Sequence, residues 1–189
     1  MNSKKIIAVI LALVAVVAVF AACGGGAPKA EPSKYESAEA VLNAVWAKFG
    51  EDEAFPIVGG LDYENSTGAG KLDVADKDTL VGTFGFPEAE IANIDSIASI
   101  MHAMNGNVFT AVAFHVVEGA DMAAVAESYK KALGERHWFC GQPDGYAVIK
   151  VDSEYMIAVY AQQPLESFKA YAAEVLVGSE VLVEASLAQ

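Results

Sequence analysis

A cysteine with a neighbouring histidine is the first arrangement in this sequence that could do chemistry. Cys140 stands three residues after His137 in the segment 136–141. A thiol attacks as its thiolate, so it needs a nearby base or cation that lowers its pKa. The segment follows a predicted helix, whose C-terminal dipole disfavours a thiolate, and it carries Trp138 and Phe139. We therefore predict a buried, unreactive Cys140. The alternative is a thiol-dependent hydrolase or redox enzyme that uses Cys140 and His137.

Two further histidines, His102 and His115, are the obvious pair to test for a shared metal ion. They lie in β-rich runs on either side of Asn105-Gly106, a dipeptide typical of a tight hairpin turn. In a two-residue turn at that point, opposite residue numbers sum to 211, so the histidines share one sheet face. They are separated there by about 20 Å at ~3.3 Å per residue, and a zinc ion needs ligands within ~2.1 Å. We predict no metal site and no cofactor.

The histidine face of this hairpin is nevertheless a candidate binding surface. Besides the two histidines it carries Phe109 and mainly small side chains, whereas the opposite face is bulkier and is expected to meet helices. Two interpretations stay open. Either the first helix or residues 51–75 cover the face, or His102, Phe109 and His115 line a surface for a peptide, a glycan or an envelope protein.

The elements that would position these residues follow the order α-α-ββα-ββα. Apolar periodicity and capping residues predict helices over 37–49, 76–84, 122–136 and 165–177. Alternating apolar runs predict hairpins over 94–117 and 146–161, with a long loop over 51–75 that holds at most one short strand. We predict one α+β domain over 37–178, with an antiparallel four-stranded sheet built from two ββα units and helices packed on one face, plus N-terminal helices. Residues 179–189 are predicted to be a frayed C-terminal tail.

Composition excludes several classes of protein. The chain has 189 residues, of which 54% are apolar, and a formal net charge of −13. The apolar content is too high for a disordered chain. The acidic balance disfavours nucleic acid as a partner, because binding to phosphates requires a basic surface. Two cysteines cannot form a disulfide framework.

The N-terminal residues 1–22 resemble a bacterial lipoprotein signal peptide. Lys4 and Lys5 precede a 17-residue apolar run that ends in Phe20-Ala-Ala-Cys23, which is similar to a lipobox. The resemblance implies cleavage before Cys23 and attachment of diacylglycerol to its thiol, so that the lipid membrane is a partner. The alternative is a plain secretory signal or an uncleaved anchor with an incidental cysteine.

Residues 23–36 are predicted to be the lipidated cysteine and a flexible linker, since they are rich in Gly and Pro. With the acidic domain that follows, this predicts an extracytoplasmic protein held at the cell membrane. The whole pattern, including residues 111–117 and 146–160, resembles an uncharacterised lipoprotein family of Gram-positive, Clostridia-type bacteria. That resemblance implies a small α+β domain and a location, and it transfers no catalytic residue. The predicted function is a binding or interaction module at the cell surface.

Overall fold

The structure, a computed structural model, describes residues 32–162 and 164–187, which contain all four predicted helices and both predicted hairpins. Side-chain oxygens of Ser37, Asp76 and Asp121 accept hydrogen bonds from the first turns of three helices. The helices are α2 (Ala38–Trp46), α3 (Lys77–Gly82), α4 (Met122–Gly134) and α5 (Pro164–Val175), with a 3₁₀ turn η1 (Glu88–Asn93). The hairpins are β3 (Ile94–His102) with β4 (Phe109–Val116), and β5 (Gly145–Lys150) with β6 (Tyr155–Ala161).

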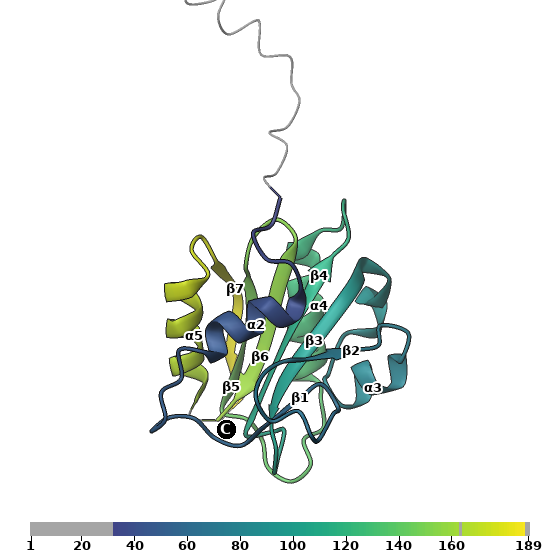
Figure 1. Cartoon of the computed structure of the whole chain (residues 1–189). Coiled ribbons are helices and arrows are strands. Elements are labelled where there is room, and N and C mark those ends of the chain that lie inside the picture. Colours follow the sequence, from purple (N-terminus) through teal and green to yellow (C-terminus); the bar gives the residue numbers. More distant parts are fainter. Residues whose placement is uncertain (1–31, 163, 188–189) are drawn as a thin grey trace, which may run out of the picture. The chain divides into compact units, whose positions relative to one another are not determined.

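The fold is α+β with one antiparallel sheet, and the sheet has seven strands instead of the predicted four (Figure 1). The order is β1-β3-β4-β6-β5-β7, and β2 pairs with β3 beside β1. The extra strands are β1 (Ile57–Gly59), β2 (Gly70–Leu72) and β7 (Glu180–Ser186). The first two lie within residues 51–75, where at most one short strand was predicted. The third replaces the predicted frayed tail.

The predicted pairing of β3 with β4 is confirmed, although the turn between them is wider than two residues. Ile97 faces Phe114 and Ala98 faces Ala113, so opposite residue numbers sum to 211 over most of the hairpin. The strands end at His102 and Phe109, and residues 103–108 form the connection. The alternation of side chains thus set the register even though the strands separate before the turn.

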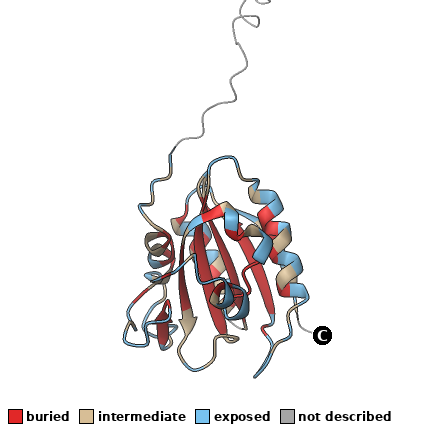
Figure 2. Ribbon diagram, turned by 90° about the vertical axis from the view of Figure 1, so that its right-hand side faces the viewer, coloured by how far each residue is buried: buried red, intermediate tan, exposed pale blue. Residues whose placement is uncertain are grey.

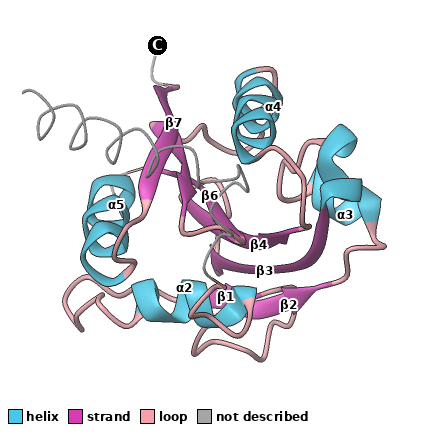
Figure 3. Ribbon diagram, turned by 90° about the horizontal axis from the view of Figure 1, so that it is seen from above, coloured by secondary structure: helices cyan, strands magenta, loops and turns pink. Residues whose placement is uncertain are grey.

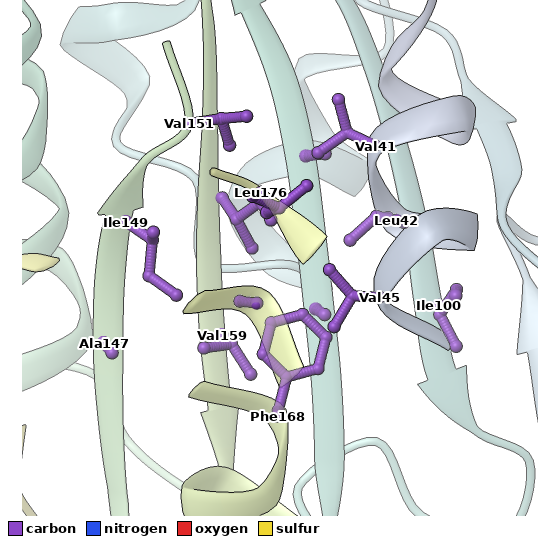
Figure 4. Packing of buried hydrophobic residues seen from close by; sticks show 14 of the residues in the cluster. Val41, Leu42, Val45, Ile100, Ala147, Ile149, Val151, Val159, Phe168 and Leu176 are labelled. Carbon is purple, nitrogen blue, oxygen red and sulfur yellow. The ribbon is translucent and has the colours of Figure 1, made fainter. Parts of the chain in front are cut away.

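Helices cover both faces of the sheet, so the prediction of helices on one face is wrong (Figure 3). On one face α2 and α5 pack through Val41, Val45 and Phe168 against Ile100 and other strand residues (Figure 4). On the opposite face α4, α3 and η1 cover a second apolar cluster that contains Phe114. Three of the central strands are buried along nearly their whole length (Figure 2). Such continuous apolar strands are typical of a sheet covered on both sides.

Candidate functional site

The two ends of the sheet carry different side chains. At one end Ser33 Oγ donates a hydrogen bond to Asp152 Oδ2 (2.6 Å) in the β5–β6 turn, and we call this the Ser33 end. The opposite end, which we call the hairpin end, is formed by residues 103–108 and 137–144. The ends are about 20 Å apart, because the paired stretch of β4 and β6 spans six steps of ~3.3 Å. Figure 1 shows the described chain beginning at the upper end and the β3–β4 connection at the lower end.

Two asparagines of the β3–β4 connection hold a second loop at the hairpin end. Asn105 Nδ2 donates to the carbonyl oxygen of Cys140 (2.8 Å). Asn107 Nδ2 donates to the carbonyl oxygens of Gly141 (2.8 Å) and Phe139. These bonds satisfy backbone groups of residues 139–141 that no helix or strand pairs, so they fix the loop against the hairpin.

His102 lies at this end of β3, in the wall between two hollows. Its Nδ1 accepts hydrogen bonds from the N–H groups of Met104 (3.1 Å) and Asn105 (3.3 Å). Because Nδ1 is an acceptor, the neutral ring carries its proton on Nε2, which is then a donor. The ring stacks on Phe55, with centroids 5.3 Å apart. His102 was a sequence-predicted site residue, and the structure places it among candidate binding groups.

Arg136 is fixed at the junction of three elements of the hairpin end. Its Nη2 donates to the carbonyl oxygens of Gly82 and Thr83 at the end of α3, both at 3.0 Å. The guanidinium carbon lies 4.9 Å from the ring centroid of Trp138 and 5.8 Å from that of Tyr160. A Cβ at Gly85 would lie 2.6 Å from Nη1, and Gly85 has φ +68°, a conformation that favours glycine.

A hollow of about 320 Å³, which we call the hairpin pocket, opens beside Arg136. None of the described residues that line it is acidic. Its rim includes Tyr63 and Met104. Its other polar lining comes from seven side chains, those of Thr83, His102, Asn105, Asn107, Thr110, Arg136 and Tyr160. The pocket is therefore neutral to cationic in a chain with a net charge of −13.

Two hydroxyls form the inner polar wall of the hairpin pocket. Thr110 and Tyr160 are cross-strand neighbours on β4 and β6, and both are almost completely buried. Thr110 Oγ1 donates to the Gly106 carbonyl (2.8 Å) and Tyr160 Oη donates to the Thr83 carbonyl (3.3 Å). Burial raises the pKa of Tyr160, against smaller lowering effects from Thr110 and the Arg136 charge. The hydroxyl therefore stays protonated at neutral pH and remains a donor to the Thr83 carbonyl.

A larger hollow of about 720 Å³ lies on the other side of His102 and has the opposite electrostatic character. Phe49 and Phe55 supply aromatic surface, and Glu53 and Asp144 supply carboxylates. Glu53 also accepts a hydrogen bond from the hydroxyl of Tyr171, and this bond raises the pKa of Tyr171. The hairpin end thus offers one acidic, aromatic hollow and one hollow without acidic groups.

Large apolar side chains are exposed around the hairpin pocket and its neighbour. Met104 is 85% exposed, Phe139 is 78% exposed and Tyr63 is 74% exposed. Phe139 lines a further hollow of about 340 Å³ that shares Arg136 with the hairpin pocket. Exposed apolar groups gathered around concave surfaces are typical of interaction sites.

The structure does not bring the other two residues of the predicted binding face to this site. Phe109 is completely buried beneath α2 and α5, so the face it belongs to is covered. His115 lies near the Ser33 end, where Nδ1 is 2.6 Å from Asp95 Oδ1 and Nε2 is 3.6 Å from Glu154 Oε2. The predicted separation of the two histidines along the sheet is confirmed by the register.

Cys140 is exposed, so the prediction of a buried thiol is wrong. Its φ of +61° makes it the one non-glycine residue with positive φ in the described part of the chain. The side chains of Asn105 and Asn107 hold its loop at the surface, and no local pattern of Trp138 and Phe139 indicates this. Among the described residues, no hydrogen bond joins its thiol to His137 or to any other group. Cys23 lies outside the described residues.

Three buried polar atoms lack a hydrogen-bond partner in residues 32–162 and 164–187: Ser99 Oγ, Tyr129 Oη and Arg136 Nη1. Ser99 lies on the same face of the sheet as Tyr160, and Tyr129 packs against that face from α4. Such atoms are costly in an apolar core. Sequence patterns did not indicate Arg136 as a binding residue, because its neighbours at the site come from α3 and β6.

The chain matches no protein-family model, no curated protein and no solved structure at a significant level. No helix in the described part of the chain is long and apolar enough to cross a membrane. In the same residues, no group of three or more His, Cys, Asp and Glu side chains could hold a metal ion. The site is therefore interpreted from its own geometry.

Proposed function

We propose that the protein is a lipid-anchored binding module of the extracytoplasmic face of the cell membrane, and that the hairpin end is its binding end. The lipobox-like segment before Cys23 supports the anchor. Diacylglycerol would be attached ten residues before Ser33, so the chain would join the lipid to the domain at the Ser33 end. Two acyl chains are what stable anchoring requires, at about 0.8 kcal/mol per buried CH₂.

One observation carries the assignment of the binding end. The exposed side chains of Tyr63, Met104 and Phe139 surround hollows at the end of the sheet opposite Ser33. A domain held by its Ser33 end can present that surface to envelope proteins, peptides or glycans. Anchoring raises the effective concentration of the domain for such neighbours without any additional contact.

Photo-cross-linking in intact cells tests the binding end. A photoreactive amino acid is placed at Phe139, at Met104 or at Val177, which is 77% exposed near the start of β7 at the Ser33 end. We expect discrete cross-linked products from positions 139 and 104 and none from 177. Equal products from all three positions, or from 177 alone, would contradict the proposal.

The anchor has a separate test. Cells are supplied with a palmitate analogue that can be labelled, and the full chain is compared with Cys23→Ala. We expect label and membrane recovery only with the cysteine present. Unlabelled protein that is released into the medium, or protein that retains residues 1–22, would contradict the anchored form.

A surface thiol enzyme that uses Cys140 and His137 is the second candidate, and the exposure of Cys140 favours it. Such an enzyme needs a thiolate at neutral pH. The pH dependence of iodoacetamide alkylation measures this directly in the folded chain. A midpoint well below about 8.5, the usual value for cysteine, would support the enzyme, and an ordinary midpoint would support the binding module.

A further inference from the structure

We infer that the hairpin pocket is an oxyanion site, in which a carboxylate or phosphate group of the ligand binds the Arg136 guanidinium. This inference rests on the proposed function, because it names the chemistry that the binding end would recognise. Three properties of the pocket carry it: the hydrogen bonds that Arg136 lacks, the charges that the pocket lacks, and the shape of its rim.

The guanidinium has donors left over. Arginine carries five N–H bonds, and within residues 32–162 and 164–187 only Nη2 has acceptors, the carbonyl oxygens of Gly82 and Thr83. Nη1 is buried without a partner, and Nε donates to none of the described residues. An oxygen of a carboxylate or phosphate group is a charged acceptor that such unpaired N–H groups bind strongly.

The charge around Arg136 is also incomplete. The chain has 25 acidic residues, yet none of the ion pairs in its described part includes Arg136. No acidic residue of the described chain lines the hairpin pocket. Arg136 also lines the neighbouring hollow of about 340 Å³, which carries Glu88 and Glu135, but neither forms an ion pair with it. Towards the hairpin pocket no carboxylate of the described residues faces the guanidinium, so an anion from outside can bind there.

The guanidinium is held in place before any ligand arrives. Two carbonyl oxygens and the faces of Trp138 and Tyr160 restrain it, and Gly85 leaves space for Nη1. Restraint of this kind lowers the entropic cost of binding. A purely structural role would explain the bonds to Gly82 and Thr83. It would not explain the open, acid-free hollow beside the guanidinium.

The size of the hairpin pocket and the side chains at its rim indicate what the remainder of the ligand is, beyond its acidic group. The pocket volume of about 320 Å³ is at the small end of ligand sites, which suits a small acid or the acidic terminus of a larger partner. Tyr63 and Met104 stand exposed at the rim and can contact apolar carbon atoms. His102 Nε2 adds one N–H donor to the lining.

Tryptophan fluorescence of the full chain in detergent tests the inference. Trp138 lies 4.9 Å from the guanidinium carbon and is the local reporter. Succinate, inorganic phosphate and neutral succinamide are titrated at constant ionic strength. We expect a saturable change with succinate, with phosphate or with both, and none with succinamide. Trp138→Phe, which keeps an aromatic ring, should remove the signal.

Matched variants locate the site. Arg136→Lys keeps the charge but loses the planar fork, and should raise the Kd about tenfold. Lys131→Gln removes one positive charge from the exposed side of α4 and should change the Kd by less than about twofold. Thr83→Phe places a large side chain in the pocket from an exposed position and should abolish binding. If Arg136→Lys does not fold, this variant alone tests whether the anion binds in the hairpin pocket.

The responses to succinate and phosphate distinguish the two kinds of ligand group. A response to succinate alone identifies a carboxylate, and a response to phosphate alone identifies a phosphate group. No anion-specific response up to about 50 mM, or a response that Thr83→Phe leaves unchanged, overturns the oxyanion site. If cross-links at positions 139 and 104 persist in that case, the proposed function stands and only the ligand chemistry is wrong.

Discussion

Removing one hydroxyl from the core should make the protein more stable. Tyr129 is completely buried on α4, where its ring stacks on Phe114 at 5.8 Å and meets the edge of Phe86 at 5.2 Å. Its Oη has no partner among the described residues, and burial raises its pKa well above the ordinary value. A buried unsatisfied polar group costs about 1–3 kcal/mol. Tyr129→Phe keeps the ring contacts, so we expect the free energy of unfolding to rise by about 1–2 kcal/mol.

Tyr160→Phe is the matched control, since it deletes the same atom on the same face of the sheet. Here the hydroxyl donates a hydrogen bond to the Thr83 carbonyl at 3.3 Å, and the substitution removes that bond. We expect the free energy of unfolding to fall by about 0.5–1.5 kcal/mol. The two substitutions should therefore have opposite signs.

Equilibrium unfolding in urea measures both changes, provided that the slope of free energy against urea is the same in the three proteins. Loss of stability in Tyr129→Phe, as in Tyr160→Phe, would refute the reasoning. It would mean that the Tyr129 hydroxyl is satisfied in solution, as an internal water with two to four polar partners could do.

Three further predictions follow from local geometry. Burial raises the pKa of four tyrosines, Tyr129, Tyr146, Tyr155 and Tyr160, so they stay protonated when unfolded chains ionise near about 10. The free energy of unfolding should therefore fall as the pH rises above about 10, as urea unfolding between pH 9 and 11 will measure. Asp121→Ala removes the α4 cap, which accepts from Ala123 and Ala124, and should cost about 1 kcal/mol in urea unfolding; Glu118→Ala, an exposed neighbour, should cost almost nothing. In a Cys23→Ala background, maleimide should label Cys140 as fast in the folded chain as in urea, because the thiol is exposed; slow labelling before denaturation would contradict the observed loop.

Local elements were predictable because their signals are local. The side chains of Ser37, Asp76 and Asp121 accept hydrogen bonds from N–H groups of the first helical turn, so each residue marks the start of a helix. The spacing of the apolar residues that follow identifies the side of the helix that is buried. The β3–β4 register followed from alternation, since a slip of one residue would move Ile97 and Phe114 to the other face.

The face of the sheet that each helix covers, and the outer strands of the sheet, could not be predicted from local signals. The helices after the two hairpins, α4 and α5, pack on opposite faces, and that choice depends on how the hairpins meet through β4 and β6. The segment 180–186 is a strand because β5 offers it an unpaired edge. Seen alone, the same residues have only a short apolar run between two glutamates.

The sequence by itself determined the helices, the two hairpins and their register, because neighbours within a few residues carry those signals. It also contains the lipobox-like segment from which the anchor is proposed. Only the tertiary structure decided which groups meet at the hairpin end. Arg136 is fixed by hydrogen bonds to carbonyl oxygens more than 50 residues away in the sequence. Cys140 is held at the surface by an asparagine 35 residues earlier. Contacts of that span depend on the packing of the whole domain, and no local pattern encodes them.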